Sequence, residues 1–452
     1  MADLIQPRTL KGFRDYPPAL MIPREWLIET ARRVYRSYGF SPIDTPALEY
    51  AEILVGKMDA EAEINRQLYR FADQGGRDVA LRFDLTVPFA RFAAQHIGQL
   101  GSPFKRYHIG LVWRGEAPQA GRFREFMQCD FDIIGTTANA ADVEIALVVN
   151  DLMVALGFER FEVRINNRLV LNGLLEELGL AEHGKTILRV LDKLGKQGRE
   201  TVFKELTAAV VDRGAGLSAE QAEQVLTLAG TGGGNDEVLA AVERQFGRNP
   251  KAAEGVARLR ELVSVARTAG IPEGRMRIDL AICRGLDYYT GTIYETFLSD
   301  LPGIGSVCSG GRYDNLAGLY TKQTLPGVGA SLGLDRLLAA MEELNLLPKA
   351  STPAAVLVVQ FSADRLGDYE RIARELRAAR IATEVYPEAK KVGPQLQYAE
   401  RRGFPLALIA GPDEFAQGLC KIKVLATREE KTVPQAGLAE AVKGLLAADK
   451  GK

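Results

Sequence analysis

Arginines and carboxylates share one face of the segment KRYHIGLVWRGEAPQAGRFREFMQCDFDIIG, residues 105–135. Two stretches that alternate with period two flank the loop GEAPQAG, and they predict a pair of antiparallel strands. The alternation places on the polar face Arg106, His108, Arg114, Arg122, Arg124, Gln128, Asp130 and Asp132. Guanidinium groups bind phosphate oxygens and stabilise a transferring phosphoryl group, whereas carboxylates and an amide suit a ligand amine or ring N–H. An ordinary solvent-facing strand shows the same alternation, so that alternative stays open.

A second segment, CRGLDYYTGTIYE at residues 283–295, places one arginine beside three tyrosines and two glycines. The plain interpretation is an edge strand that the chain enters through a glycine turn. The alternative is a binding site for a ligand that is flat, polar and partly apolar, because such a ligand fits aromatic hydroxyls beside a cation.

The composition limits the class of protein. The chain has 452 residues, enough for two or three domains, and its 46% apolar and 25% charged residues are typical of a soluble globular protein. A formal net charge of −1 offers no bulk attraction for nucleic acid. The 4 cysteines and 3 histidines do not have the spacing of a zinc site, so we expect no metal ligands. The first residues lack the apolar core of a signal peptide, and no run of about 18 apolar residues occurs, so we expect a cytoplasmic protein without a membrane segment.

Several elements must position these residues. Residues 20–38 carry apolar side chains at helical spacing, and Gly39 ends the run. Residues 172–268 are rich in helix-forming residues and predict several amphipathic helices that break at GTGGGND. The Pro-containing segment 344–355 predicts a linker, and the strand–helix alternation beyond it predicts a small α/β domain.

The order of the motifs resembles that of class II aminoacyl-tRNA synthetases. The hairpin resembles motif 2, with Arg114 and Glu116 at its Arg-x-Glu positions. GVGASLGLDRLLAAM resembles motif 3 and carries Arg336, while YGFSPIDTPALEY resembles motif 1 with Pro46 as its proline. RGLDYYTGTIYE and SGGRYDNL closely resemble the two signature peptides of histidyl-tRNA synthetases. This resemblance covers nearly the whole chain.

The resemblance implies an α/β (α+β) fold with two domains. Residues 1–346 are expected to form a class II catalytic domain on an antiparallel β-sheet flanked by helices, with a helical insertion at about 172–268. Residues 351–452 are expected to form a C-terminal α/β anticodon-binding domain, although they carry only 16 Lys and Arg against 13 Asp and Glu. The anticodon assignment therefore depends on the resemblance rather than on charge.

The activity that the resemblance implies is that of a histidine–tRNA ligase. Such an enzyme activates L-histidine with ATP to histidyl-adenylate and then transfers histidine to the 3′ end of tRNA(His). ATP is its substrate, Mg²⁺ accompanies the ATP, and the enzyme is a cytoplasmic homodimer. We expect Phe40, Ile43 and Leu48, near the motif 1 proline, to supply apolar contacts between the two subunits.

The resemblance also assigns the site residues. Arg284 and Arg114 are catalytic, with Arg284 acting on the substrate carboxylate and the α-phosphate. The histidine-binding residues are Asp84, Thr86, Gln128, Asp132, Tyr288 and Tyr289. The ATP-binding residues are Arg114, Glu116, Arg122 and Arg336. In this family the peptide GSVCSGG, residues 305–311, lines the histidine pocket, and imidazole is the flat ring that the tyrosines would contact.

Two related classes stay open as alternatives. One is the histidine-sensing regulatory subunit of ATP phosphoribosyltransferase, which shares the catalytic fold but typically lacks the anticodon domain and the arginine of the first signature peptide. The other is a prolyl or threonyl class II synthetase, in which neither signature peptide is expected.

Overall fold

A computed structural model describes residues 4–56, 63–117, 121–210, 214–283, 288–347 and 351–449. The chain divides into two compact units, which are Met1–Arg14 with Leu27–Asn345 and Asp15–Trp26 with Leu346–Lys452. Each unit has its own β-sheet and its own apolar core.

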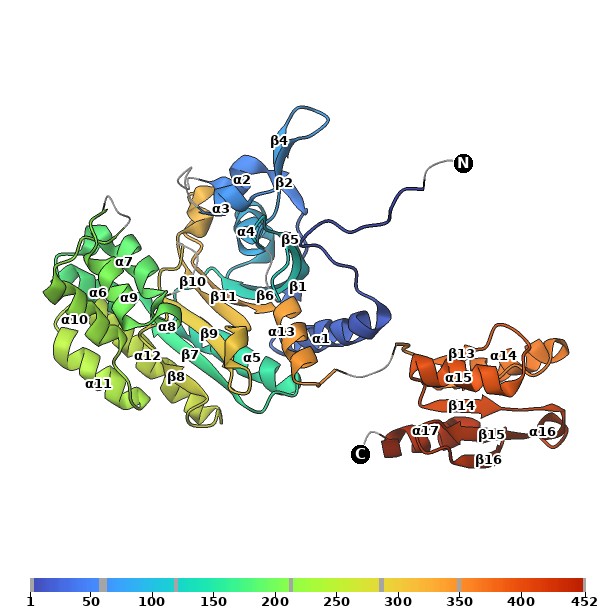
Figure 1. Ribbon diagram of the computed structural model, residues 1–452. Helices are drawn as coiled ribbons and strands as arrows, with labels where there is room; N and C mark the ends of the chain where they lie inside the picture. Colours follow the sequence, from blue (N-terminus) through green and yellow to red (C-terminus); the bar gives the residue numbers. More distant parts are fainter. Residues whose placement is uncertain are drawn as a thin grey trace. The chain divides into compact units, whose positions relative to one another are not determined.

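The first unit is built on an eight-stranded sheet with the spatial order β1-β5-β6-β11-β10-β9-β7-β8 (Figure 1). In that order the strands span Ser41–Pro42, Phe104–Trp113, Glu125–Ile134, Gly327–Gly333, Cys308–Tyr313, Thr292–Leu298, Phe161–Asn167 and Met276–Ile278. Neighbouring strands are antiparallel except at the two edges, where β1 pairs with β5 and β8 pairs with β7 in parallel. The predicted antiparallel sheet is therefore confirmed.

The hairpin of β5 and β6 confirms the two strands predicted around the GEAPQAG loop. Its register sets Arg106 opposite Asp132 and His108 opposite Asp130. Both carboxylates are buried, with exposed fractions of 1% for Asp130 and 3% for Asp132. The solvent-facing interpretation of this strand face is therefore wrong, because the polar face is turned into the protein as well as the apolar one.

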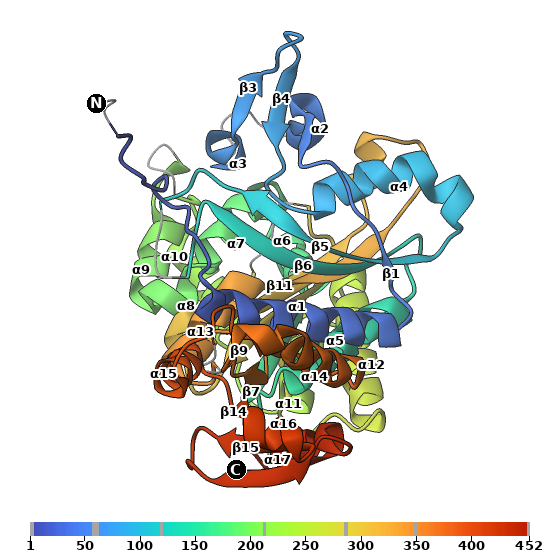
Figure 2. The same ribbon diagram turned by 90° about the vertical axis from the view of Figure 1, so that its right-hand side faces the viewer.

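Helix α1 (Pro18–Ser37) confirms the predicted N-terminal helix. The ring of Tyr35 packs 4.8 Å from that of Phe131, and the Tyr35 hydroxyl donates to the carbonyl oxygen of Cys129 at 3.0 Å. Figure 2 shows α1 on one side of β5 and β6 and α4 (Thr86–Leu100) on the other side. The hairpin thus lies between helices, which explains why both of its faces are buried.

The motif 1 segment corrects one expectation about subunit contacts. Phe40 is buried at 2% exposure, with its ring edge-on to Phe131 at 5.9 Å. Its side chain completes the core of its own chain, so the expectation that it faces a partner subunit is wrong. Leu48 is 39% exposed and is available for such a contact.

A second sheet, of three strands in the order β2-β4-β3, directly precedes the segment that carries Asp84. Its strands span Leu48–Tyr50, Asp78–Leu81 and Arg70–Ala72, and the sheet rises above α4 in Figure 2. Strand β4 is followed at once by the turn that carries Asp84 and then by α4. This connection places a carboxylate directly before a helix.

The helices predicted between 172 and 268 are confirmed, and the first begins slightly earlier because Asn167 caps it through a hydrogen bond from Leu169 N. They are α6 (Arg168–Glu177), α7 (Gly184–Leu191), α8 (Leu194–Gln197), α9 (Arg199–Thr207), α10 (Ala219–Ala229), α11 (Asn235–Phe246) and α12 (Pro250–Thr268). The GTGGGND segment separates α10 from α11, as its glycines predict.

The second unit contains a five-stranded sheet of order β13-β12-β14-β15-β16. The strands span Thr383–Val385, Val356–Val358, Leu406–Ile409, Leu419–Val424 and Glu430–Pro434, and the main helices are α14 (Leu366–Ala378), α15 (Val392–Arg402) and α17 (Leu438–Asp449). The predicted strand–helix alternation is confirmed, but β16 was missed. Only Val433 of that strand is buried, so its sequence carries no apolar alternation. None of the helices in the described ranges combines the length and the apolar character that crossing a membrane requires.

Candidate active site

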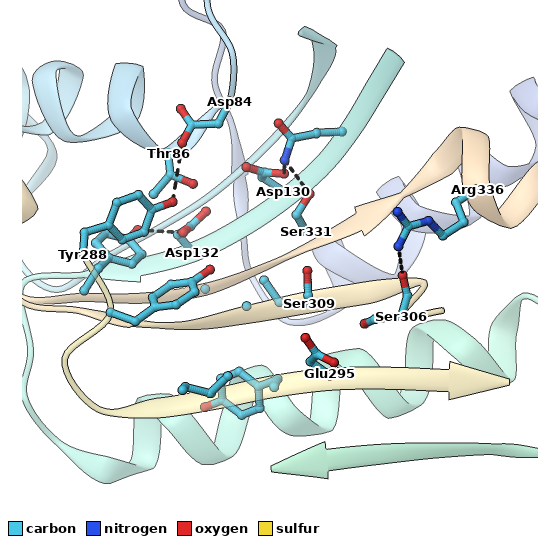
Figure 3. A pocket seen from close by; sticks show the side chains of 18 of the residues that line it. Asp84, Thr86, Asp130, Asp132, Tyr288, Glu295, Ser306, Ser309, Ser331 and Arg336 are labelled. Carbon is cyan, nitrogen blue, oxygen red and sulfur yellow. Dashed lines mark hydrogen bonds between the residues drawn. The ribbon is translucent and has the colours of Figure 1, made fainter. Parts of the chain in front are cut away.

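A cavity of about 230 Å³ lies in the first unit, over the strands at the middle of its sheet (Figure 3). The predicted site residues that line it are Asp84, Thr86, Arg114, Arg122, Gln128, Asp132, Tyr288, Tyr289 and Arg336. The hairpin β5–β6, the start of α4, the entry to β9 and the start of α13 (Leu334–Glu343) carry these residues. Segments more than 200 residues apart in the sequence therefore meet at one place, as the hydrogen bond between Tyr288 and Asp84 illustrates.

Glu116 is the one predicted site residue in the described part of the chain that is not in the cavity wall, and Arg284 lies outside the described residues. The carboxylate of Glu116 lies 3.8 Å from the guanidinium of Arg122, and its backbone oxygen accepts a hydrogen bond from Arg124 Nε at 3.1 Å. Glu116 therefore lies beside the cavity-lining Arg122 rather than in the wall itself.

Asp84 supplies one buried carboxylate at the start of α4. It accepts a hydrogen bond from Val87 N at 3.1 Å, and the Tyr288 hydroxyl donates to it at 3.4 Å. Burial raises the pKa of Asp84 to about 6, and the hydrogen bond from Val87 and the charge of Arg114 oppose that shift. Above that pH the carboxylate is ionised and can hold a ligand ammonium group.

Asp132 supplies a second carboxylate, deeper in the sheet. The Tyr313 hydroxyl donates to its Oδ1 at 2.6 Å, and Arg106 Nη2 lies 2.7 Å from its Oδ2. Burial raises the pKa of Asp132, while Arg106 and Tyr313 act against the shift. Gly329 on the neighbouring strand makes room for this carboxylate, because a Cβ there would lie 2.1 Å from Asp132 Oδ1.

Aromatic rings form one wall of the cavity. Tyr288 and Tyr289 meet edge to face with centroids 5.1 Å apart, and Tyr288 meets Tyr313 in the same manner at 6.0 Å. Burial raises the pKa of both Tyr288 and Tyr289 above the ordinary tyrosine value, so their hydroxyls stay neutral near pH 7. The strand they lead into, β9, lies between β10 and β7, so the edge-strand interpretation is wrong. The wall suits a flat ligand with polar edges.

Arginines also line the cavity, and Figure 3 shows Arg336 on the side away from Tyr288. Arg114 donates from Nε to the carbonyl oxygen of Phe83 at 3.0 Å, and Arg336 donates to the carbonyl oxygen of Ser306. Asp335, next to Arg336, accepts from Met127 N at 2.8 Å and so ties the start of α13 to β6. Fixed guanidinium groups at one place suit a polyphosphate.

The sequence of the chain matches the models of two known protein families. A family model described as histidyl-tRNA synthetase matches residues 12–337, and a model described as an anticodon binding domain matches residues 354–445.

The chain belongs to the histidyl-tRNA synthetase family. The predicted resemblance and the predicted fold class are thereby confirmed. The alternative of a prolyl or threonyl class II synthetase is wrong, because the matching family has a different amino-acid specificity.

Individual relatives of this histidyl-tRNA synthetase family member cover most of its length. The histidine–tRNA ligase of Rhodopirellula baltica is 58% identical over 95% of this chain and 96% of its own. The crystal structure of histidyl-tRNA synthetase from Nostoc sp. PCC 7120 has a TM-score of 0.88 at 34% identity and covers 97% of this chain and 99% of its own.

A third solved structure has a similar fold at low sequence identity. A Bacillus halodurans structure described as an ATP phosphoribosyltransferase regulatory subunit/histidyl-tRNA synthetase has a TM-score of 0.72 at 22% identity, and it covers 88% of this chain and 97% of its own. At this identity the likeness shows the fold alone. The fold by itself therefore does not separate a ligase from a regulatory subunit.

Several cavity residues had no predicted role in the histidyl-tRNA synthetase site. They are Asp130, Ile293, Tyr294, Glu295, Tyr313, Gly329, Ala330 and Ser331. Asp130 could have been found from the sequence, because it lies on the predicted polar face between Gln128 and Asp132. Tyr313 and Ser331 could not, because their approach depends on the pairing of β10 and β6 with β11.

Among the residues that the structure describes, no group of three or more His, Cys, Asp or Glu side chains could hold a metal ion. A metal ion that arrives with a nucleotide does not need such a group, because Mg²⁺ keeps several waters and is held largely by substrate phosphates.

Proposed function

We propose that this chain is a histidine–tRNA ligase that makes histidyl-adenylate and transfers histidine to the 3′ end of tRNA(His). The observation that carries the proposal is that one cavity combines two kinds of polar side chain. Buried carboxylates and tyrosine hydroxyls line it together with Arg114, Arg122 and Arg336. Histidine requires the carboxylates and hydroxyls, and the phosphates of ATP require the arginines. The family membership and the names of the relatives support the same activity.

In this proposal the amino acid binds between two carboxylates. Asp84 and Thr86 hold the α-ammonium group, and burial around the ammonium strengthens its attraction to the Asp84 carboxylate. Asp132 and Gln128 bind polar edges of the imidazole ring. Tyr288 and Tyr289, which belong to the aromatic wall, contact the faces of the imidazole ring and supply further hydroxyl groups.

ATP enters as its Mg²⁺ complex and is the co-substrate. Arg114 binds the α-phosphate, Arg122 and Arg336 bind the β- and γ-phosphates, and Glu116 faces the adenine. A carboxylate oxygen of histidine attacks the α-phosphorus in line, a new P–O bond forms, and the bond to the pyrophosphate oxygen breaks. Catalysis consists of positioning and of charge stabilisation, without a covalent enzyme intermediate. By resemblance Arg284 acts at the carboxylate and the α-phosphate.

The transfer step uses the second substrate. A hydroxyl of the terminal ribose of tRNA attacks the carbonyl carbon of histidyl-adenylate, an ester bond forms, AMP leaves with the bonding electrons, and the hydroxyl proton is released to the departing phosphate or to water. We assign the chemistry to residues 1–346 and anticodon reading to residues 351–452, which contain the region that matches the anticodon-binding model. We further propose a homodimer in the cytoplasm, with Leu48 and the half-buried Ile43 near the subunit contact.

ATP–pyrophosphate exchange with each of the twenty amino acids tests this proposal. A ligase of this specificity exchanges with histidine and stays at background with the others. A purified protein that binds histidine but supports no exchange would instead match a regulatory subunit. The presence of a region matching the anticodon-binding model favours the ligase, because the regulatory class typically lacks it.

A further inference from the structure

One buried guanidinium lies against the two buried carboxyl groups of Asp130 and Asp132 in the cavity wall. Arg106 is fully buried, and its Nη2 lies 2.7 Å from Asp132 Oδ2 and 3.8 Å from Asp130 Oδ2. The same nitrogen donates to the carbonyl oxygen of Leu85 at 3.2 Å, and the guanidinium carbon lies 4.4 Å from the centre of the Phe89 ring. One buried guanidinium therefore lies against both carboxyl groups.

The two carboxyl groups are not equivalent. Asp132 has the closer contact with Arg106 and also accepts the Tyr313 hydroxyl at 2.6 Å. Asp130 has the longer contact with Arg106, and its other partners are neutral: the Ser331 hydroxyl donates to it, and the amide of Gln128 reaches it at 3.4 Å. Hydrogen bonds and nearby cations stabilise the ionised form, so the negative charge belongs on Asp132 and a proton belongs on Asp130.

Few of the groups around Asp130 are charged near pH 7, so few can change where the proton lies. The titratable and charged groups that face it are Arg106 and His108 on β5, Asp132 on β6, Asp84 before α4, Arg82 after β4, Tyr35 on α1, Tyr289 before β9 and Cys308 on β10. Burial raises the pKa values of Tyr35, Tyr289 and Cys308, and it lowers the pKa of His108 to about 3. These four groups are neutral near pH 7, so the charged groups around Asp130 are the two arginines and the other two aspartates.

We propose that Asp130 is a positioning residue that holds a proton in the working site, so that Arg106 neutralises Asp132 alone and Asp132 accepts the ring N–H of histidine. This inference rests on the proposed function, since it assumes that histidine occupies the cavity. It adds to that function the protonation states of Asp130 and Asp132 with which the pocket recognises a neutral imidazole ring.

The sign of the pH dependence follows from the direction of ionisation. Burial raises the pKa of Asp130 to about 7; Arg106 and the hydrogen bond from Ser331 act against the shift, and the charges of Asp132 and Asp84 act with it. Asp130 is protonated below that pH and ionised above it. When it ionises, a second negative charge competes for Arg106 and loosens the contact that holds Asp132 in place. As far as Asp130 is concerned, histidine recognition is therefore strong near neutral pH and weakens as pH rises through the pKa.

The test compares the full-length protein with Asp130→Asn, which copies the protonated carboxyl group in shape and in charge. Asp132→Asn removes the proposed ring acceptor, and Asp300→Asn changes a surface aspartate that pairs with Arg160. Histidine binding is followed by calorimetry at pH 8 in two buffers with different ionisation enthalpies, which reports the protons taken up. Exchange kinetics with histidine are measured from pH 6.5 to pH 8.5.

When histidine binds at pH 8, Asp130→Asn should not take up the proton that its carboxyl group would carry. The wild-type protein and Asp300→Asn should each take up nearly one proton more than this variant does. Their kcat/KM for histidine should fall by about tenfold per pH unit well above the pKa, since the protonated fraction falls by that factor. The fall should appear in the KM for histidine, and Asp130→Asn should lose it. Asp132→Asn should bind histidine weakly throughout the pH range.

Equal proton uptake by the wild-type protein and Asp130→Asn, or the same fall of kcat/KM in both, would overturn the assignment of the proton. An Asp130→Asn protein that is folded but as weak as Asp132→Asn at every pH would overturn it too, because the ionised form would then be the working one. A wild-type protein that binds no histidine at all would contradict the proposed function instead. The calorimetric readout does not require catalysis, so the two failures can be told apart.

Discussion

Replacement of Gly329 by alanine should damage histidine recognition through a single methyl group. Gly329 lies on β11 opposite Asp132, and its backbone is not in the left-handed region that would exclude alanine. A Cβ at this position would lie 2.1 Å from Asp132 Oδ1 and 2.6 Å from the carbonyl oxygen of Phe131. The perturbation is therefore steric, and it acts on the carboxylate that is proposed to bind the imidazole ring and on the backbone of β6 beside it.

The size of the effect can be worked from these contacts. Ordinary van der Waals contact of a Cβ begins at 3.4 Å, so the Asp132 carboxylate must retreat by roughly 1.3 Å. A misplacement of about 1 Å costs on the order of 100-fold in catalysis. We therefore expect kcat/KM for histidine to fall about 100-fold, with a much smaller change in the KM for ATP. Overpacking should also lower the free energy of unfolding by about 1–3 kcal/mol.

The assay is ATP–pyrophosphate exchange with histidine and ATP varied separately, together with thermal unfolding. Gly333→Ala on the same strand is the matched control, because its Cβ would meet Val307 O at 3.5 Å, within ordinary contact. That variant should behave nearly as the wild type does. If Gly329→Ala is folded and its kcat/KM for histidine lies within threefold of the wild-type value, Asp132 does not position the ring.

Four further outcomes are expected. Arg284→Ala should slow adenylate formation by about two or three orders of magnitude and weaken substrate binding less, and near-normal exchange would remove this residue from the mechanism. Histidine affinity should fall as pH drops through about 6, where Asp84 becomes protonated, and a pH titration of binding to Asp84→Asn should lack that component. A chain ending at Leu346 should keep exchange and lose tRNA charging, whereas equal losses in the two assays would contradict the anticodon assignment. Sedimentation at micromolar concentration should show a species of twice the 49.4 kDa chain mass, and a purely monomeric species would count against the homodimer.

The sequence was sufficient to predict the fold class and most of the cavity wall. Period-two alternation predicted β5 and β6, helical spacing predicted α1, and glycines marked the break between α10 and α11. The motif resemblance then assigned residues such as Asp84, Gln128 and Tyr288 to one site, and all three line the cavity although they lie far apart in the sequence. These predictions succeeded because local patterns and motif order are properties of the chain itself.

The remaining features depend on strand pairing, which the sequence alone does not show. The contact of Tyr313 with Asp132 arises because β10 and β6 both pair with β11. The burial of Phe40 and of the polar face of the hairpin depends on the helices that cover the sheet. Strand β16 was missed because only one of its residues is buried, so no alternation marks it.

The most direct test of the central claim is aminoacylation of a total tRNA preparation by the purified full-length chain, with each labelled amino acid offered in turn with ATP and Mg²⁺. We predict that histidine is esterified to tRNA(His) and that no other amino acid is incorporated above background. Attachment of a different amino acid, or histidine-dependent exchange without any transfer to tRNA, would contradict the assignment as a histidine–tRNA ligase.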